Sequence, residues 1–350
     1  MESGDLPIPD LEPGALLVRN EMAGICGSDL HLWRGTTFRP MQFPFLLGHE
    51  TVGRIVRLAE GRTHDCAGES LRVGDRVLWE NIACGGCYWC RIDHEPTLCA
   101  RRIWQGVNTP DAYPHLSGGF GEYSYISPKS AVVRVPDDLT NEEVVGVGCA
   151  FMTVVHAWER LGGLQPQDNV VILGSGPLGL YATLLAREGG AATIIVVGAP
   201  ARRLALAREW GADYTIDIEQ TPDPADRLTE IVGRTRGIGP DVVVGVAGVP
   251  QVFADGLEMV RPGGRYLEVG NTVQTTVAVA PALLVYKQLT VIGSCHADIS
   301  HIYRALEFVR THRHAYPFAS LVSGRYSLSQ ATEALLAMEA EREIKAVLVP

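Results

Sequence analysis

The stretch VVILGSGPLGL, residues 170–180, joins an apolar run of strand length to the beginning of a helical pattern. It contains the pattern Gly-x-Gly-x-x-Gly at Gly174, Gly176 and Gly179, with Pro177 and Leu178 between the last two glycines. In such a loop the first glycine permits a tight turn and the second lets the backbone approach a pyrophosphate. The third lets the helix pack against the strand, and the helix N-terminus offers N–H groups to phosphate. The stretch therefore predicts a dinucleotide-binding unit.

Apolar runs of strand length follow this loop at regular intervals. With the first run they occupy residues 169–174, 193–198, 214–218, 241–246, 265–270 and 289–294. Helical patterns over 177–190, 201–212 and 225–235 separate the first four. Continuous apolar strands that alternate with helices indicate a parallel sheet covered on both faces. The pattern predicts an α/β fold with a six-stranded, doubly wound nucleotide-binding domain.

The chain outside this region has a different pattern of apolar residues. Its first 150 residues consist of short apolar runs interrupted by Gly and Pro, which predicts a compact β barrel or sandwich. Residues 299–312 read as an amphipathic helix within a mixed C-terminal segment. We expect residues 1–153 and 296–350 to form one domain and residues 154–295 to form the nucleotide-binding domain.

The composition excludes several classes of partner. The 350 residues carry a net charge of −10 and contain no long basic block, so nucleic acid and anionic membranes are poor partners. No apolar run looks long enough to span a bilayer, and the acidic, Pro-rich N-terminus does not resemble a secretory signal. We therefore expect a cytoplasmic protein, a setting in which stable disulfides are disfavoured.

Two short motifs and a distant cysteine suggest catalytic chemistry. GICGSDLH supplies Cys26, LLGHE supplies His49 and Glu50, and GCAFMTVVHA supplies Cys149. Thiolate, imidazole and carboxylate all bind zinc, and three protein ligands with an open position form a catalytic site. Zinc there would lower the pKa of an alcohol and favour hydride release to a nicotinamide. Each residue alone also has an ordinary structural interpretation, such as a packed cysteine or a salt-bridged glutamate.

A second cluster of cysteines lies in ACGGCYWCRIDHEPTLC, residues 83–99. Its four thiols belong to Cys84, Cys87, Cys90 and Cys99. A disulfide knot, a redox switch, an iron–sulfur cluster and a zinc site are all possible. The cytoplasmic setting disfavours disulfides, and an iron–sulfur motif of this type needs a fourth cysteine where His94 stands. Cys66 and Cys295 have no partner at metal spacing and are expected to be packed thiols.

Together these motifs resemble the zinc-dependent medium-chain dehydrogenase/reductase family of alcohol, polyol and threonine dehydrogenases. The resemblance covers nearly the whole chain and rests on CGSDLH, GHE, GDRV, the cysteine cluster, GGFGEY, GSGPLG and the terminal IKAVLVP. It implies a GroES-like β-barrel catalytic domain beside a Rossmann domain. It also implies that Cys26, His49 and Cys149 bind catalytic zinc, that Glu50 can approach the metal, and that Ser28 and His31 relay a proton.

The same resemblance implies a second, structural zinc in a lobe at about residues 80–105. Cys84, Cys87, Cys90 and Cys99 match its four ligands, and the last spacing is one residue longer than the common family form. The expected cofactors are thus two zinc ions per chain and NAD(P).

The end of the second nucleotide-binding strand bears on which nicotinamide is used. NAD-dependent relatives carry an acidic residue there, and this chain has Gly198. The loss of the acid removes a charge that would repel a 2′-phosphate, and Arg202 and Arg203 follow shortly after. The sequence therefore leans slightly to NADP over NAD.

The predicted function is a zinc-dependent NAD(P)-linked alcohol dehydrogenase acting on a secondary or polyhydroxy alcohol. A non-catalytic nucleotide-binding protein of the same fold and a zinc-free reductase are the alternatives. Segments that could line a substrate cleft contain Trp33, Arg34, Phe38, Trp104, His115 and Phe120. The strand near residues 290–294 would be a sheet edge, which predicts a homodimer or homotetramer.

Overall fold

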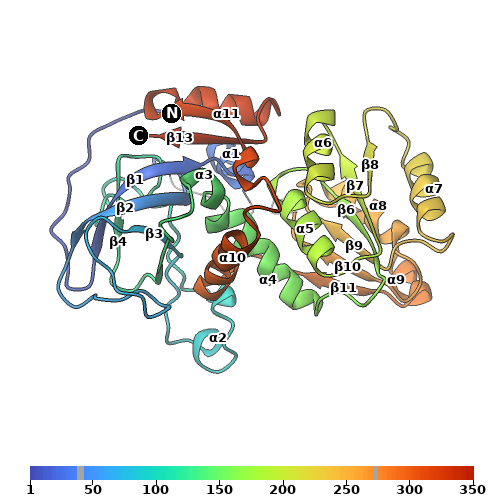
Figure 1. Ribbon diagram of the computed structural model, residues 1–350, viewed down its shortest axis with the longest axis horizontal. Helices are drawn as coiled ribbons and strands as arrows, with labels where there is room; N and C mark the ends of the chain where they lie inside the picture. Colours follow the sequence, from blue (N-terminus) through green and yellow to red (C-terminus); the bar gives the residue numbers. More distant parts are fainter. Residues whose placement is uncertain (38–42, 271–274) are drawn as a thin grey trace. The chain divides into compact units, whose positions relative to one another are not determined.

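The structure is a computed structural model that describes residues 1–37, 43–270 and 275–350. The chain forms two compact units (Figure 1). Unit 1 consists of residues 1–152 and 296–350, and unit 2 consists of residues 153–295. Phe38, one of the residues expected near a substrate cleft, lies outside the described residues.

Unit 2 is built on a six-stranded parallel sheet in the order β11-β10-β9-β6-β7-β8. Its strands are β6 (Asn169–Leu173), β7 (Thr193–Gly198), β8 (Tyr214–Asp217), β9 (Val242–Gly245), β10 (Arg265–Glu268) and β11 (Thr290–Gly293). Its helices are α4 (Met152–Leu161, which begins at the boundary), α5 (Pro177–Glu188), α6 (Ala201–Glu209), α7 (Pro224–Arg234), α8 (Pro250–Met259) and α9 (Pro281–Lys287). All six strands lie inside the ranges predicted from the sequence, and the doubly wound fold is confirmed.

The strand order places the glycine loop at a functional position in this sheet. Strand β6 is buried along its whole length and pairs with β7 on one side and β9 on the other. The chain order therefore reverses at β6, and the loop that leaves its carboxyl end begins at Gly174. In open α/β sheets such a reversal point is where ligands bind.

Unit 1 is built on a seven-stranded sheet in the order β12-β13-β1-β2-β3-β5, with β4 paired to β1. Its strands are β1 (Leu16–Gly24), β2 (Glu50–Leu58), β3 (Arg76–Trp79), β4 (Tyr123–Ile126), β5 (Val132–Arg134), β12 (Val322–Ser327) and β13 (Lys345–Val349). Its helices are α1 (Gly27–Arg34), α2 (Tyr88–Arg91), α3 (Asn141–Val144), a π-helical turn (Val147–Phe151), α10 (Ile299–His312), α11 (Ala331–Glu339) and single 3-10 turns at Pro96–Leu98, Phe318–Leu321 and Leu328–Gln330.

The C-terminal strand completes the sheet of unit 1. Strand β13 pairs antiparallel with β1, where Ala23 lies opposite Leu348, and β1 pairs with β2, where Gly24 lies opposite Glu50. This pairing brings the last residues of the chain beside the loop that begins at Ile25. Helix α11 packs on β13 through Leu335 and Ala334, which are fully buried.

One helical stretch of the described residues, Asn141–Leu161, is long and apolar enough to be considered as a membrane span. Sequence reasoning missed it because no single uninterrupted apolar run marks it. Of its 18-residue apolar window, 67% is buried inside the protein, as in an ordinary core helix, so it is weak evidence for a span.

Candidate active site and metal centres

The first predicted ligand set comes together in unit 1. The ligand atoms of Cys26, His49, Glu50 and Cys149 all lie within 4.8 Å of one another. The Sγ atoms of Cys26 and Cys149 are 3.9 Å apart. Two thiolates that share a tetrahedral zinc, each about 2.3 Å from it, would be separated by about 3.8 Å. The arrangement therefore fits a shared metal ion.

Local structure explains how these side chains are presented. Cys26 is the N-cap of α1, Glu50 is the first residue of β2 with His49 directly before it, and Cys149 lies on the π-helical turn. Gly24, opposite Glu50, leaves room for the carboxylate, because a Cβ there would lie 2.5 Å from Glu50 Oε2. Widened helical turns of this kind are frequent at functional sites.

Asp29 supports two members of this cluster and was not identified from the sequence. Its Oδ2 accepts a hydrogen bond from the Cys26 backbone N–H at 2.8 Å, and its Oδ1 lies 3.2 Å from His49 Nδ1. The Asp29 side chain is fully buried. Burial lowers the His49 pKa, but the Asp29 carboxylate outweighs it and raises that pKa well above its usual value. A carboxylate on Nδ1 leaves Nε2 as the nitrogen that can bind a metal.

The two thiols of the cluster are hydrogen-bonded to each other, and this bond shifts their pKa values in opposite directions. The hydrogen bond from Cys149 lowers the Cys26 pKa well below its usual value, and the same bond raises the pKa of Cys149. Cys26 is therefore the first thiol of the pair to become a thiolate, the form that binds zinc.

Glu50 lies in an ion pair with Lys345 of the C-terminal strand. The Lys345 ammonium contacts Glu50 Oε2 and donates to the backbone carbonyl of Ile25 at 3.3 Å. The exposed fractions of the two side chains are 0% for Glu50 and 2% for Lys345. The other carboxylate oxygen, Oε1, is buried without a hydrogen-bond partner. An orphaned carboxylate oxygen beside two thiols and an imidazole is what a cation site would leave in a protein without its ion.

The two residues predicted to relay a proton both lie on α1. Ser28 Oγ is 3.4 Å from His49 Nε2, so this hydroxyl lies directly beside the ligand cluster. His31 lies one turn further along the helix, where its Nδ1 is 3.1 Å from Thr36 Oγ1.

The second ligand set also comes together, in the lobe around α2. The sulfur atoms of Cys84, Cys87, Cys90 and Cys99 lie within 4.8 Å of one another, and those of Cys87 and Cys90 are 3.5 Å apart. A hydrogen bond from the Gly86 backbone N–H lowers the Cys84 pKa to about 6. Because this N–H points at the sulfur, the loop favours a thiolate. Four thiolate donors in one shell form a closed zinc site.

The extra residue in this loop is accommodated by a local bend. His94 has φ of 56°, in the left-handed region, and the backbone N–H of Glu95 returns to the carbonyl of Trp89. The longer C-x8-C spacing thus still brings Cys99 to the other three thiols.

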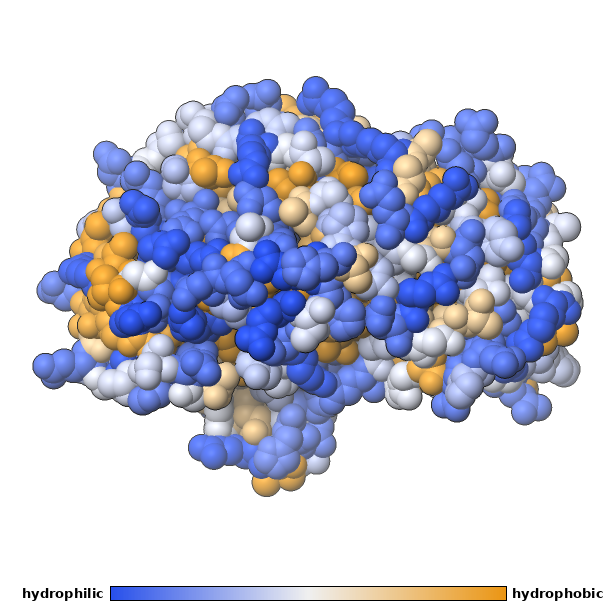
Figure 2. Space-filling view, viewed as in Figure 1, coloured by the Kyte–Doolittle hydropathy of each residue, from blue (hydrophilic) through white to orange (hydrophobic). Residues whose placement is uncertain are grey.

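The cysteine lobe has almost no apolar core of its own. Neither α2 nor the turn Pro96–Leu98 buries a residue, and Tyr88 and Ile92 are 59% and 67% exposed. Apolar colour is visible at the tip of this lobe, below α2 (Figures 1 and 2). A segment that buries so little apolar surface needs another source of stability, and a four-thiolate metal site would supply it.

The nucleotide loop of unit 2 has the geometry that its glycines predict. Gly174 has φ of 126°, and a Cβ on Gly179 would lie 1.9 Å from the Gly174 carbonyl oxygen. Gly176 is the N-cap of α5, with Pro177 and Leu178 in the first turn, and a Cβ on Gly176 would meet no atom within 4 Å. The loop is thus closed where helix and strand pack, and open at the helix N-terminus, where a phosphate can bind.

Gly198 is the last residue of β7, and Arg202 and Arg203 lie in the first turn of α6. That turn contains no acidic residue.

Sequence comparison matches both units to known families. Residues 12–137 match the alcohol dehydrogenase GroES-like domain, and residues 177–311 match the zinc-binding dehydrogenase family. The chain belongs to the zinc-binding dehydrogenases. The GroES-like and Rossmann folds implied by the motifs are thereby confirmed.

Individual relatives of this dehydrogenase cover nearly its whole length. The 5-exo-hydroxycamphor dehydrogenase of Pseudomonas putida is 33% identical over 99% of this chain and 95% of its own. An alcohol dehydrogenase structure from Thermotoga maritima has a TM-score of 0.91 and 33% identity, covering 99% of this chain and 94% of that one. A structure described as a zinc-binding dehydrogenase, from Sinorhizobium meliloti and bound to NADP, has a TM-score of 0.85 and 30% identity over 99% and 94% of the two chains.

Several residues expected near a substrate are engaged elsewhere. The Arg34 guanidinium makes two hydrogen bonds to Glu339, of 2.8 and 2.6 Å, and lies over the Trp33 ring. His115 Nδ1 is 2.9 Å from the Pro110 carbonyl oxygen, and Phe120 packs in the core beside Leu47. Arg34 is therefore already paired with an acidic side chain of its own chain.

Trp104 differs from these residues because its ring lies against a histidine ring in a tilted arrangement. Its ring centroid lies 4.3 Å from that of His296, at a 56° interplanar angle.

The prediction for Cys66 and Cys295 was wrong, because both are exposed rather than packed. The burial of a single cysteine depends on tertiary neighbours, which the local sequence does not reveal.

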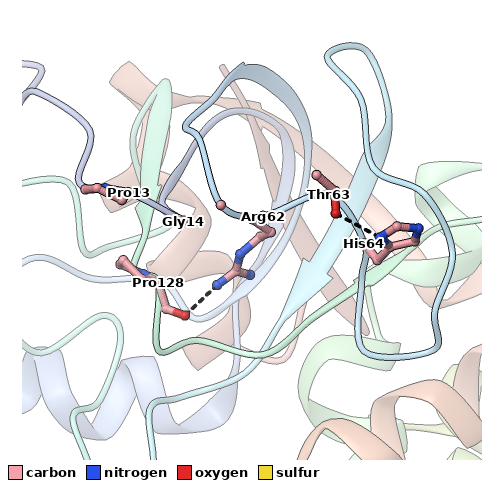
Figure 3. Close-up of a pocket in the computed structure, with 7 residues that line it drawn as sticks. Pro13, Gly14, Arg62, Thr63, His64 and Pro128 are labelled. Atoms are coloured by element: carbon pink, nitrogen blue, oxygen red, sulfur yellow. Dashed lines mark hydrogen bonds between the residues drawn. The ribbon is translucent and has the colours of Figure 1, made fainter.

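A separate surface pocket contains none of the predicted residues. Pro13, Gly14, Arg62, Thr63, His64 and Pro128 line it (Figure 3). The Arg62 guanidinium donates hydrogen bonds to three backbone carbonyls, those of Ser127, Pro128 and Ser130. We therefore interpret Arg62 as a residue that stabilises this loop and not as a ligand-binding residue.

Proposed function

We propose that this protein is a zinc-dependent, NAD(P)-linked alcohol dehydrogenase that interconverts a secondary or polyhydroxy alcohol and its carbonyl compound. The observation that carries the proposal is the cluster of Cys26, His49, Glu50 and Cys149 within 4.8 Å, in a chain that belongs to the zinc-binding dehydrogenases. We assign catalytic zinc to this cluster and a structural zinc to the cysteine lobe. A non-catalytic nucleotide-binding protein would have no physical reason to retain Ser28 beside such a cluster.

Zinc, when bound, lowers the pKa of the alcohol hydroxyl, and the nicotinamide accepts hydride. The protein's own part is to orient and to move a proton. Asp29 fixes His49 and the Cys26 backbone, which orients two ligands. In the proposed relay the Ser28 hydroxyl, beside the ligand cluster, takes the alcohol proton as its own proton passes on toward His31 and water.

Replacement of Ser28 by alanine should slow alcohol oxidation by about 100-fold or more, because general base catalysis of this kind contributes about that factor. His31→Gln should cost less and should shift the pH–rate profile, since water can replace a terminal acceptor. The measurements are kcat against pH and zinc content, with Ser320→Ala, an exposed hydroxyl, as the control. An unchanged rate in Ser28→Ala with full zinc content would rule out the relay.

We propose NADP as the preferred nicotinamide, on the absence of an acid at Gly198 and the presence of Arg202 and Arg203. The relative from S. meliloti, 30% identical, has been solved with NADP. A panel of simple, polyhydroxy, amino and bulky cyclic secondary alcohols should give kcat/KM at least as high with NADP⁺ as with NAD⁺. A preference for NAD⁺ of more than about tenfold, roughly 1.4 kcal/mol, would contradict the NADP assignment. No turnover with any alcohol and either cofactor would contradict the enzyme itself.

We propose that the chain forms a homodimer or homotetramer through unit 2. Strand β11 is the outer strand of the parallel sheet, and an uncovered edge pairs readily with an identical one. On the preceding helix α9, Val285 and Tyr286 are 71% and 86% exposed.

Light scattering should therefore give a molar mass of two or four chains. The double variant Val285→Asp/Tyr286→Asp should reduce that mass, because two charges would have to be buried in the interface. Tyr88→Asp, which changes an exposed residue of unit 1, is the matched control. A single-chain mass for the wild type would contradict the assembly.

A further inference from the structure

The end of β7 is crowded on the side that faces the nucleotide loop. A Cβ placed on Gly198 would lie 2.5 Å from Ser175 Oγ, 2.8 Å from Ser175 Cβ and 3.0 Å from the Ser175 backbone nitrogen. Contacts below 3.0 Å do not occur between such atoms in folded proteins. The side chain of Ser175 thus fills the space in which any side chain at position 198 would begin.

Ser175 is held in this position rather than resting there loosely. Its side chain is nearly buried, since the residue is 3% exposed. Its hydroxyl donates a hydrogen bond of 2.9 Å to the carbonyl of Ala199, the residue that directly follows Gly198. A rotation of the side chain away from Gly198 would break this hydrogen bond in a nearly water-free position.

The two backbones cannot easily separate either. The Gly174 N–H donates to the Val197 carbonyl at 2.8 Å, which ties the loop to β7 just before Gly198. On the other side, the Ile218 N–H donates to the Gly198 carbonyl at 3.1 Å. Both hydrogen bonds oppose a shift that would make room for a side chain.

From this geometry we propose that Ser175 is a cofactor-specificity residue, because it excludes an acidic side chain from the end of β7. The inference rests on the proposed nicotinamide function and deepens it. An acid at this position is what binds the free ribose 2′-hydroxyl of NAD and repels the 2′-phosphate of NADP. With Ser175 present, the acid-free end of β7 near Arg202 and Arg203 cannot be converted to an NAD-type site by a single substitution at Gly198.

The neighbouring strand does not replace the missing acid. Asp217, the last residue of β8, lies opposite Gly198 in the sheet. Its Oδ1 accepts a hydrogen bond from the Glu219 backbone N–H at 2.9 Å, so it caps its own turn.

The test is a double-mutant cycle between positions 175 and 198 in the full-length protein. Gly198→Asp, Ser175→Gly and their combination are compared with the wild type by calorimetric binding of NAD⁺ and NADP⁺ and by thermal unfolding. Gly198→Asp alone should lower the unfolding midpoint by about 3 °C or more and weaken both dinucleotides at least tenfold. The combination should recover the midpoint and shift the ratio of the two affinities at least tenfold toward NAD⁺. Ser175→Gly alone should change that ratio less than threefold.

A smaller side chain separates crowding from charge. Gly198→Ala adds only the Cβ, so it should destabilise the protein when Ser175 is present. The same substitution should be tolerated in the Ser175→Gly background, because the Oγ and Cβ contacts are then gone. Of the three Ser175 contacts, only the backbone nitrogen at 3.0 Å remains. If Gly198→Ala and Gly198→Asp are as stable as the wild type, or if Gly198→Asp alone shifts the affinity ratio as far as the combination does, the proposal is wrong. The wild-type affinity ratio tests the NADP assignment separately, because the coupling between the two positions does not depend on which dinucleotide the wild type prefers.

Discussion

Replacement of Cys26 by alanine should abolish alcohol oxidation and remove one of two zinc ions while the chain stays folded. Cys26 is the thiol with the lowered pKa in its cluster, so its loss removes the thiolate that forms most readily beside His49. The fold should survive, because the sheet of unit 1 and its buried residues do not depend on this side chain. Asp29 would still cap α1 through the backbone N–H of residue 26.

Replacement of Cys87 by alanine should give the opposite pattern. It should remove the other zinc and lower the unfolding midpoint, since the lobe exposes Tyr88 and Ile92 and buries almost nothing that could replace the metal. Turnover should persist at temperatures well below the new midpoint, because the first cluster keeps all four donors.

Elemental analysis, thermal unfolding and turnover of the same preparations distinguish the two sites. Cys66→Ala is the matched control, because Cys66 is exposed and lies in neither cluster. One zinc per wild-type chain, or iron in place of zinc, would contradict the assignment of two zinc sites with separate roles.

The sequence predicted unit 2 nearly in full because its inner strands β6, β7 and β9 are buried on both faces. Residues 169–173 are buried throughout and therefore appear as an uninterrupted apolar run. The glycine loop has its own local signature, in which each glycine is needed for a particular backbone contact. Local patterns thus predicted both the fold of unit 2 and the backbone geometry of the glycine loop.

Unit 1 was harder to predict from the sequence, because its sheet pairs strands that are far apart along the chain. The short, mostly antiparallel strands predict a barrel or sandwich, but no periodicity shows that Ala23 pairs with Leu348. The residues of the two proposed metal sites were located through their motifs, and the residues that contact them, Asp29 and Lys345, were not. Asp29 could have been suspected from its place three residues after the N-cap Cys26, a capping-box position. Lys345 gives no such signal, since a lysine in IKAVLVP reads as an exposed strand residue.

Lys345→Met should destabilise the protein by about 3–5 kcal/mol, because it leaves the Glu50 carboxylate buried without its counter-charge. Burial alone would lower the Lys345 pKa, but Glu50 outweighs it and raises that pKa to about 12. The ammonium is therefore charged at every pH at which the enzyme would be studied. Its loss also removes the hydrogen bond to the Ile25 carbonyl, next to Cys26, so we expect weaker zinc binding as well.

The stability that Lys345→Met loses relative to the wild type should depend on pH, and the pKa of Glu50 sets the direction of that dependence. Burial raises the Glu50 pKa to about 7, and Lys345 acts against that rise, so without Lys345 the pKa should be higher still. A carboxyl whose pKa is higher in the folded than in the unfolded state loses stability as pH rises between the two values. The free energy of unfolding of Lys345→Met should therefore fall further below wild type at about pH 8.5 than at about pH 6.

Denaturant unfolding of Lys345→Met with and without Glu50→Gln tests this ion pair. The second substitution removes the buried charge, so the double variant should recover most of the lost stability and lose the pH dependence. Lys345→Arg keeps the charge in a larger group, so its free energy of unfolding should lie between those of Lys345→Met and the wild type. If Lys345→Met is as stable as the wild type at both pH values, the buried Glu50 carboxylate must have another partner. A metal ion is the first candidate, because Glu50 Oε1 is buried without a hydrogen-bond partner. Zinc content of the same samples decides that case, because a metal that replaces Lys345 must be present in full.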